Sequence, residues 1–583
     1  MIGAGVVDGI AIQKVFVFVT QPGEMGLPAP SDARAEHARF AEAVRLSQVQ
    51  LEQIVLKIKR DAGEEAAGIL EYQILILEDD DFLGKIRGGI EAGQGSEAAV
   101  RVTCTEYAEF FRHMDNDYLK QRCIDILDIQ KRLLDALGGR ADLTALDREV
   151  IVAASDLTPS QVAEMENAWV KGILLENGGA SSHSIILARS LSIPCVIGLS
   201  GLMAGLCGNE TVIMDGATGE VIVEPSDEQV RRYQAKRAAR ERDRALLRDY
   251  IEREPVTLDG RRVGVYANIS SQAETGPLLA HGGEGVGLLR TELLYMTFEK
   301  TPSREAQYGV YAGIAKALGG RPLVVRTLDV GGDKHIEYLG IEPEENPFLG
   351  YRAIRYCLDH PALFEEQIAA ILMAADAGDV RVMFPMIATV DELLRARRIV
   401  EHVERELAAQ GAVPRKIPIG MMVEVPSVAL MAEAFARHVD FFSIGTNDLT
   451  QYLFAADRSN KKVAHLNNSF HPALLRCVEH VCAAACARGI EVEICGQAGE
   501  TPELIPLWIA MGVSGLSVSI PTLPLVRKVI CETDAARAKR DLETVLTMES
   551  AEDVARYLHE KTKEDQKKMR IGNHVECAVG SQK

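Results

Sequence analysis

The sequence lacks any apolar run that reaches the ~18 residues needed to span a bilayer, which predicts a protein without membrane insertion. It also lacks an excess of positive charge, because 84 Asp and Glu outnumber 64 Lys and Arg and leave a net charge of −20. Proteins that bind nucleic acid present a basic surface, so we expect no nucleic-acid partner. An acidic chain instead suits a basic protein partner or Mg²⁺-assisted handling of anions.

Paired-cysteine motifs and targeting signals are missing as well. The eleven cysteines are scattered and contain no C-x-x-C pair, which favours a reduced, cytoplasmic protein over a disulfide framework. The first residues, MIGAGVVDGIAIQKVFVFV, lack the basic stretch and cleavage site of a signal peptide and predict short strands. No G-x-x-x-x-G-K-[ST] loop occurs, which excludes a Walker-type phosphate site.

Helical periodicity fills residues 31–140, where proline is absent. Apolar residues recur there at steps of three and four, the spacing of amphipathic helices, and predict a helical bundle. Residues 1–30 and 141–225 alternate short strands with short helices, which predicts one α/β domain into which the bundle is inserted. Residues 226–255 predict a long charged helix, and a helix that is polar nearly all round often bridges domains.

Residues 256–583 alternate strand and helix with a regular period before a C-terminal tail. Eight strand segments, each followed by a helical pattern or by a loop that leads into one, predict a (β/α)₈ barrel of the TIM type. An open doubly wound sheet is the alternative for this pattern. The whole chain is therefore predicted to be an α/β multidomain protein.

In such a barrel the chemistry lies at the C-terminal ends of the strands. The strand ends and the loops after them carry arginines, carboxylates and an amide, namely Arg290, Arg326, Glu424, Asn447, Asp448 and Arg458. Guanidinium groups bind phosphate and carboxylate in forked pairs, while Glu424 and Asp448 together suit a Mg²⁺ ion. These residue types in this pattern predict a small substrate with several negative charges.

Two further features each have two interpretations. Cys495, at the end of the seventh strand, is either a buried packing residue or, among cationic groups, a proton-transfer group. The segment ILILEDDD, Ile74–Asp81, is either a helix end exposed to solvent or an apolar patch beside acidic residues that docks a basic partner. The sequence pattern alone leaves both pairs open.

The stretch NGGASSHSIILARS places one histidine, His183, between a glycine-rich turn and an apolar helical run. Its small neighbours allow close approach, and the free N–H groups of a helix N-terminus favour an anion. An imidazole in that setting is suited to accept a phosphoryl group at neutral pH. The alternative is a plain anion-binding loop in which His183 only donates a hydrogen bond.

Several motifs resemble one known family. GGASSHSIILARS resembles the phosphohistidine signature of the phosphoenolpyruvate (PEP)-utilising enzymes, and GVGLLRTELLYM, VVRTLDVGGDK, EENPFLGYRAIR, MMVEVPSVAL and FFSIGTNDLTQY resemble parts of their barrel domain. Within that family the sequence is most similar to enzyme I of the PEP:sugar phosphotransferase system. The resemblance extends from GIAIQKVFV to about residue 545, in the same domain order.

The resemblance implies a phosphoryl relay that starts at the barrel. PEP would bind at the barrel mouth, with Mg²⁺ held by Glu424 and Asp448. His183 would take the phosphoryl group by in-line displacement, and Cys495 matches the residue that protonates the departing enolate to give pyruvate. The positions that match or assist PEP binding in the family are Arg290, Arg326, Lys334, Arg352, Asn447, Asp448 and Arg458.

The resemblance also implies protein partners. Phospho-His183 would pass its group to a histidine of the phosphocarrier protein HPr, docked on the inserted bundle, as the first step of sugar uptake. The α/β domain would swing between barrel and carrier about the linker helix. The barrel would hold two copies of the chain together as a homodimer.

Two departures from the enzyme I pattern point to alternatives. Ala180 stands where enzyme I usually has arginine, and CGQAGE at Cys495 replaces the usual CGE; both variants resemble PEP synthase and pyruvate phosphate dikinase. Those enzymes carry a large ATP-binding domain before the histidine, whereas mostly helical sequence precedes it here. A nitrogen-type regulatory paralogue, which normally has an extra sensory domain, and an inactive scaffold are further alternatives. The retained site residues argue against the scaffold.

Overall fold

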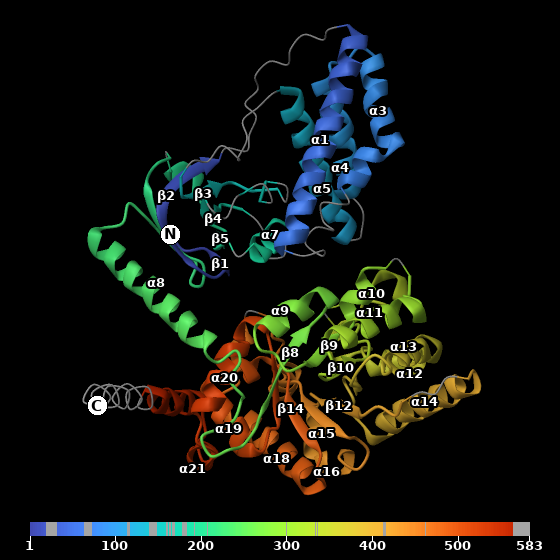
Figure 1. Ribbon diagram of the computed structural model, residues 1–583, viewed down its shortest axis with the longest axis vertical. Coiled ribbons are helices and arrows are strands. Elements are labelled where there is room, and N and C mark those ends of the chain that lie inside the picture. The colour runs from blue at the N-terminus through green and yellow to red at the C-terminus, as the bar shows by residue number, and fades with distance from the viewer. Residues whose placement is uncertain are drawn as a thin grey trace. The chain divides into compact units, whose positions relative to one another are not determined.

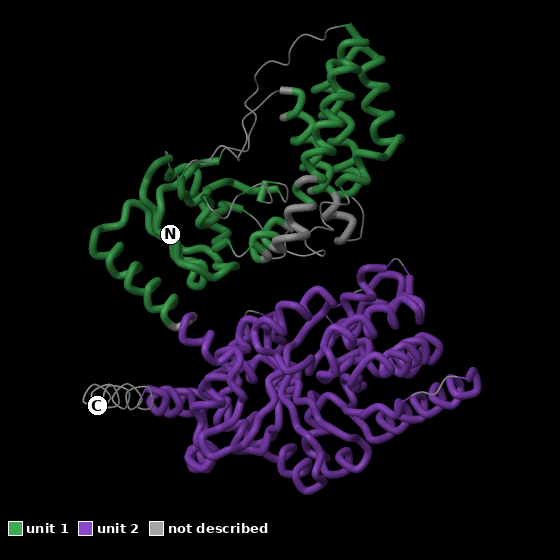
Figure 2. Tube along the Cα trace, viewed as in Figure 1, with its two compact units in different colours: residues 1–242 green, residues 243–583 purple. Residues whose placement is uncertain are grey.

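The chain divides into two compact units in the computed structural model, Met1–Arg242 and Asp243–Lys583 (Figure 2), and each is described by itself. The boundary falls within one helix, α8 (Asp227–Arg248). None of the described helices is long and apolar enough to span a lipid bilayer. The residues that the structure describes are 1–18, 32–62, 73–112, 117–138, 148–158, 161–162, 165, 169–177, 183–191, 193–206, 208–298, 300–332, 334, 336–411, 415–460 and 462–563.

The first unit contains a seven-stranded sheet in the order β1-β5-β4-β3-β2-β6-β7 (Figure 1). The central strands β2 to β5 are parallel neighbours, while β1, β6 and β7 pair antiparallel. Because strands from both sides of the helical segment join one sheet, the bundle is an insertion in an α/β domain, as predicted. The strands span Ala4–Val7 (β1), Ile10–Phe18 (β2), Val150–Ala154 (β3), Val170–Leu175 (β4), Cys195–Ile197 (β5), Thr211–Asp215 (β6) and Glu220–Val223 (β7).

The inserted bundle is held together by an apolar core and by buried polar contacts such as those of Glu36. Glu36, only 2% exposed, accepts hydrogen bonds from the backbone N of Ser96 at 2.8 Å and pairs with Arg39 at 3.0 Å. Asp79 caps α3 by accepting from the backbone N of Phe82 at 2.8 Å. The helices span Ala33–Ala62 (α1), Asp80–Glu91 (α3), Ser96–Arg112 (α4) and Asp117–Gly138 (α5).

The first part of α8 is attached to the sheet of the first unit by ion pairs. Asp215, fully buried at the end of β6, binds Lys236 at 2.5 Å and Arg240 at 3.3 Å. Burial opposes ionisation of Asp215, but the hydrogen bond from Lys236 and the charge of Arg240 hold its pKa below the usual value. The charged helix predicted for this region is therefore present, and its N-terminal turns belong to the first unit.

The second unit contains a closed barrel of eight parallel strands, β8 to β15 (Figure 1). The last strand closes on the first through the register pairs of β15 and β8. The predicted TIM-type barrel is confirmed, and the open doubly wound sheet is wrong. The strands span Gly264–Ile269 (β8), Val286–Arg290 (β9), Leu323–Arg326 (β10), Val380–Phe384 (β11), Ile419–Val423 (β12), Phe441–Ile444 (β13), Glu491–Ile494 (β14) and Gly515–Val518 (β15).

Helices cover the outside of the barrel (Figure 1). They span Thr275–Ala280 (α9), Glu292–Met296 (α10), Arg304–Ala317 (α11), Ile354–Asp359 (α12), Pro361–Ala374 (α13), Val390–Ala409 (α14), Pro426–Leu430 (α15), Ala432–Phe435 (α16), Thr446–Leu453 (α17), Pro472–Arg488 (α18), Ile505–Met511 (α19), Leu523–Glu532 (α20) and Ala535–Val545 (α21). Their apolar faces pack on the outward residues of the strands in one large core.

Alternation along each strand separates the barrel lumen from this outer core. On β13, Phe442 and Ile444 pack in the outer core, whereas Phe441 belongs to a smaller cluster inside the barrel that also contains Cys495. The lumen is filled with side chains. A Cβ atom at Gly420 would lie 2.3 Å from the ring of Phe441, so only glycine fits at that position.

Candidate active site

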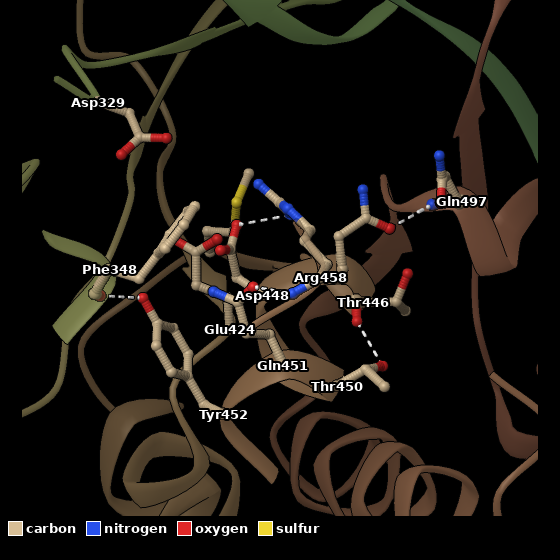
Figure 3. Close-up of polar contacts among 12 residues, drawn as sticks. Asp329, Phe348, Glu424, Thr446, Asp448, Thr450, Gln451, Tyr452, Arg458 and Gln497 are labelled. Atoms are coloured by element: carbon tan, nitrogen blue, oxygen red, sulfur yellow. Dashed lines mark hydrogen bonds and ion pairs between the residues drawn. The ribbon is translucent and has the colours of Figure 1, made fainter. Parts of the chain in front are cut away.

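The residues predicted for the active site lie where the barrel strands end. Arg290 and Arg326 are the last residues of β9 and β10, Glu424 follows β12, Asn447 and Asp448 lie in the first turn of α17, and Cys495 follows β14. Figure 3 shows Asp448 beside Glu424 and Arg458. Because all eight strands are parallel, these residues occupy one end of the barrel.

Asp329, in the loop after β10, is a buried carboxylate that binds three cations. Its oxygens lie 3.2 Å from Arg326 Nη1, 2.8 Å from Lys334 Nζ and 2.9 Å from Arg352 Nη2. Burial by itself would raise the pKa of Asp329, but the three positive charges lower it well below its usual range. This carboxylate therefore stays ionised and fixes the spacing of the cations around it.

Glu292, at the start of α10, binds two of the same cations from another side. Its Oε1 accepts hydrogen bonds from Arg326 Nη2 and from Lys334 Nζ. Burial tends to lower the pKa of Arg326, but Glu292 and Asp329 raise it above its usual value. A guanidinium that is only 5% exposed is thus kept charged by its partners.

Arg352 and Arg458 contact Asp448 and share one aromatic ring. Arg352, 1% exposed, lies 3.4 Å from Asp448 Oδ1, and Arg458 lies 3.8 Å from Oδ2. The Phe348 ring has Arg352 at 5.8 Å and Arg458 at 5.7 Å from its centroid, within cation–π range. The hydroxyl of Tyr452 donates to the carbonyl of Phe348 (Figure 3), which ties this loop to α17.

Glu424 and Asp448 form a pair of neighbouring carboxylates. Glu424, 1% exposed, accepts a hydrogen bond from the backbone N of Met386 at 2.6 Å. Burial first, and then the charges of Asp448 and Asp329, raise the pKa of Glu424 to about 8. This repulsion is what a bound cation would relieve.

The described residues contain no group of three or more His, Cys, Asp or Glu side chains that could hold a metal ion. A metal at Glu424 and Asp448 would therefore have two protein carboxylates and would complete its coordination with substrate oxygens and water. Mg²⁺ is commonly bound in this way, by one or two carboxylates together with phosphate oxygens. The donor set fits this ion.

Cys495 is a buried thiol at the edge of this cluster. Its Sγ donates to the carbonyl of Ile444 at 3.5 Å, and the residue is 5% exposed. Burial raises the pKa of Cys495 to about 11; Ser443 and the nearby arginines lower it, while Glu424 raises it. The thiol therefore keeps its proton at neutral pH and is suited to donate it. It is not suited to bind a metal or to act as a nucleophile, because both roles need the thiolate.

His183 is the first residue of α7 (His183–Ser190), in the first unit. The following residue, Ser184, is 4% exposed and donates its hydroxyl to the carbonyl of Leu157 at 2.5 Å. Since Leu157 follows β3 and α7 follows β4, the start of α7 lies at the carboxyl edge of two parallel strands. Residues 178–182, which include Ala180, lie outside the described residues.

The structure joins some of the predicted residues directly and others only through their charge. Arg326, Lys334 and Arg352 meet at Asp329, and Asp448 joins them through Arg352. The Oδ1 atom of Asn447 accepts a hydrogen bond from the backbone N of Gln497 at 3.0 Å. Arg290 is linked to the site by its charge, which lowers the pKa of the Cys495 thiol.

Sequence reasoning missed the residues that hold the cations. Asp329 and Glu292 had no assigned role, although Asp329 lies three residues after Arg326 in VVRTLDVGGDK and Glu292 lies two residues after the end of β9. A signal was available, because an arginine buried at a strand end needs an anionic partner. Phe348 and Tyr452 carry no such signal, since their contacts depend on the loop conformation.

Three family models match the chain in order along the sequence. The N-terminal domain of PEP-utilising enzymes matches residues 2–122, the mobile domain of PEP-utilising enzymes matches 146–219, and their PEP-binding domain matches 244–535. The last of these contains the barrel and every candidate residue at its mouth. The mobile-domain match contains His183.

Curated relatives match over almost the whole chain. A phosphoenolpyruvate-protein phosphotransferase of Bacillus sp. (strain S) is 40% identical over 563 residues, which cover 95% of this chain and 97% of the relative. The protein of the same name from Bacillus subtilis (strain 168) is 38% identical over 565 residues, covering 96% and 99%. An NMR structure of an enzyme I protein (nEIt) aligns at 31% identity with a TM-score of 0.37, covering 41% of this chain and 99% of that chain.

Replacement of Asp329 by Asn tests whether this carboxylate holds the site together. The amide keeps the size but leaves three buried cations without their shared anion, so we expect the free energy of unfolding of the barrel at pH 7 to fall by about 3–5 kcal/mol. Because the folded pKa of Asp329 is depressed, its stabilisation is present above the pKa of an unfolded aspartate, about 3.9, and is lost below it. Urea unfolding at several pH values measures both effects.

A matched control is Asp376→Asn, which removes a carboxylate that is 74% exposed and lies 3.8 Å from Arg415. Exposed pairs contribute little to stability, so the control should unfold like the parent at every pH. Equal stabilities for Asp329→Asn and Asp376→Asn would show that the cations do not depend on Asp329.

Proposed function

The chain belongs to the phosphoenolpyruvate-protein phosphotransferase family of PEP-utilising enzymes, and we propose that it moves the phosphoryl group of PEP to its own His183, releasing pyruvate. It then passes the group to a histidine of a phosphocarrier protein. The observation that carries this proposal is the buried network of Arg326, Lys334 and Arg352 beside the carboxylate pair at the barrel mouth. Such a network matches a small substrate with two anionic ends.

The charge of the site supports PEP bound together with a divalent cation. With Glu424 ionised, as metal binding requires, the mouth carries five cations and four carboxylates, which leaves one net positive charge. The charged residues are Arg290, Arg326, Lys334, Arg352 and Arg458, and Glu292, Asp329, Glu424 and Asp448. PEP carries close to three negative charges at neutral pH, since a phosphate contributes about two and its carboxylate contributes one more. A divalent cation brings the total charge near zero.

Glu424 and Asp448 are the residues that would hold Mg²⁺. Their mutual repulsion and their two-carboxylate donor set support this assignment. When bound there, Mg²⁺ supplies charge neutralisation of the phosphoryl oxygens. The fixed network of arginines and Lys334 does the rest of the positioning, because its side chains are held by Asp329 and Glu292 before substrate arrives.

We assign the phosphoryl-accepting role to His183. A ring nitrogen lone pair forms the N–P bond while the P–O bond to the enolate oxygen breaks, and the electron pair of that bond stays with the oxygen. The position of His183 at the start of α7, where free N–H groups and the helix dipole favour an anion, supports this role.

Cys495 is assigned to the protonation of the enolate. The thiol proton moves to the terminal carbon of the enolate, which gives pyruvate and leaves a thiolate. A buried thiol with a pKa of about 11 supports this role, because it keeps its proton until a strong base such as the enolate forms beside it. Asn268 accepts a hydrogen bond from Ser517 and donates to the carbonyl of Cys495 at 3.0 Å, which holds the strand end in place.

The carrier protein that we propose is HPr or an HPr-like protein, docked on the bundle of residues 31–140. Exposed apolar side chains support a docking surface there. Leu75 and Phe110 are each 62% exposed, and Leu75 lies in ILILEDDD, three residues before the acidic run that begins at Glu78. An apolar contact with an acidic rim suits a basic partner.

The remaining assignments are extensions of the same proposal. They comprise the first step of sugar uptake as the pathway, a cytoplasmic location and a homodimer formed through the barrel. They also comprise a swing of the α/β domain about residues 226–255, and the predicted boundaries at residues 30, 140, 225 and 255. The near full-length identity to phosphoenolpyruvate-protein phosphotransferases supports this account over one based on PEP synthase or pyruvate phosphate dikinase.

Labelling with [³²P]PEP tests the role of His183. The parent protein with Mg²⁺ should acquire acid-labile, base-stable label, and His183→Ala should acquire none because the accepting nitrogen is gone. The control His559→Ala removes a histidine that is 61% exposed and should label like the parent. Equal labelling of His183→Ala and the parent would contradict the assignment.

Replacement of Cys495 by Ala tests the proton donor. Removing a positioned general acid lowers a rate by roughly 10²–10⁴-fold, so we expect pyruvate formation in a single turnover to slow by about that factor. Cys486→Ala, which removes an exposed thiol on α18, should leave the rate unchanged. An unchanged rate in Cys495→Ala would make Cys495 a packing residue.

The requirement for Mg²⁺ should depend on Glu424. Glu424→Gln removes one of two carboxylate ligands, and we expect half-maximal labelling to need roughly 10–100-fold more Mg²⁺, the loss typical when a residue that supports a metal site is changed. A Mg²⁺ titration of the [³²P]PEP reaction measures this concentration. The exposed Glu433→Gln on α16 is the control. An unshifted titration would place the metal elsewhere.

A further inference from the structure

A carboxyl group lies inside the barrel, below Cys495 on the same strand. Glu493 precedes Cys495 by two residues, and side chains two apart on a strand point to the same side. Val492 and Ile494, on either side of Glu493 in the sequence, pack in the outer core, whereas Cys495 belongs to the cluster in the lumen. Glu493 therefore points into the lumen, where it is 4% exposed.

The adjacent strand places a hydroxyl beside both residues. Ser443 on β13 is the register partner of Glu493 on β14, and parallel neighbours direct their side chains to the same face. Ser443 also acts on the thiol above it, because it lowers the pKa of Cys495. Among the described residues, neither Ser443 Oγ nor Glu493 Oε2 has a hydrogen-bond partner.

The groups around Glu493 leave it without an ion pair. The charge of Arg381 on β11 acts on Glu493, but Arg381 pairs with Asp379 and with Glu491 at 3.1 Å each. On β8, the ring of Tyr266 lies close by, since a Cβ at Gly515 would be 2.7 Å from Tyr266 Cε2 and 3.2 Å from Glu493 Cγ.

Burial and the charge of Glu491 raise the pKa of Glu493 to about 7, with Arg381 opposing them. The carboxyl is thus held in the lumen with a proton that it can release near neutral pH. Burying an unpaired polar group costs folding free energy, and an apolar side chain would fill this space at less cost. A carboxyl kept there with one oxygen unpaired points to a use in proton transfer.

We propose that Ser443 and Glu493 form a proton relay that returns a proton to Cys495 after the thiol has protonated the enolate. This inference rests on the proposed function, in which each turnover leaves Cys495 as a thiolate. Neither relay residue touches the substrate, so both act through Cys495.

The relay balances as two linked proton transfers. The thiolate sulfur forms an S–H bond with the proton of the Ser443 hydroxyl as its O–H bond breaks, and the Ser443 oxygen takes the carboxyl proton of Glu493. Glu493 is left as a carboxylate, and water supplies its next proton. Toward the start of β14 the next residue on the lumen side, Glu491, is 60% exposed, so solvent reaches this end of the strand.

Isotope exchange between pyruvate and PEP tests the relay without any carrier protein. The enzyme is incubated with PEP, Mg²⁺ and a mixture of [1-¹⁴C]pyruvate and methyl-tritiated pyruvate. Entry of ¹⁴C into PEP counts reverse transfers, in each of which the thiolate removes a methyl hydrogen. Tritium found in water counts the thiol protons that reach solvent before the next forward transfer returns them to pyruvate.

The measured quantity is the tritium released per ¹⁴C exchanged. The relay predicts that Glu493→Gln and Ser443→Ala lower this ratio at least threefold relative to the parent, because the thiol then keeps its triton. The control Glu433→Gln makes the same chemical change at an exposed position on α16, and its ratio should equal that of the parent. A purely structural role would slow both labels by the same factor and leave the ratio unchanged.

Unchanged ratios in both relay variants would overturn the relay while the ¹⁴C exchange still supports the proposed function. Absence of ¹⁴C exchange in the parent would instead overturn the proposed function itself. A stability measurement gives a second check on Glu493. Its folded pKa is raised, so its contribution to stability is present below the usual glutamate value of about 4.3 and is lost as pH rises through about 7.

The melting temperature of Glu493→Gln should therefore rise relative to that of the parent as pH increases from 5 to 8, whereas that of Glu433→Gln should not. A relative melting temperature that stays flat with pH would show that the Glu493 carboxyl does not hold its proton in the lumen, and would overturn the relay.

Discussion

Buried arginines at the mouth of the barrel are the constraint on which the site depends. Arg326 and Arg352 are 5% and 1% exposed, and a charge in that environment is tolerated only with a well-placed partner. Asp329 supplies that partner for both and for Lys334. These ion pairs preorganise the site, since they hold the cations at fixed spacing before an anion binds. The loops after β9 and β10 are shaped by this requirement.

The pKa values of two carboxyl groups in this site, Asp329 and Glu424, shift in opposite directions because their neighbours differ. Three cations depress the pKa of Asp329, whereas burial and the nearby charges of Asp448 and Asp329 raise that of Glu424 to about 8. The first carboxylate is satisfied by the protein itself. The second is satisfied only by a proton or by an external cation. That difference separates the anions that hold the protein together from those that would hold a metal.

The barrel was predictable because its signal is local, whereas the site network is not. Each strand shows as a mostly apolar run, so the eight strands follow from the sequence, as do the positions of Arg290, Arg326 and Glu424 at or directly after strand ends. The role of Asp329 depends on Arg352, 23 residues away, and a pattern read along the chain does not reveal that contact. The assigned role of His183 stays a prediction, as do the domain boundaries.

The proton and the phosphoryl group are supplied by different parts of the chain under this mechanism. His183 lies in the first unit, while Cys495, Ser443 and Glu493 lie on adjacent strands of the second. A relay built into β13 and β14 needs nothing from the unit that carries the histidine. Cys495 can therefore regain its proton while phospho-His183 is engaged with a carrier. Reprotonation of Cys495 and dephosphorylation of His183 can thus proceed independently. A buried carboxyl with an unpaired oxygen is unfavourable for folding, and this independence is the functional advantage that would offset its cost.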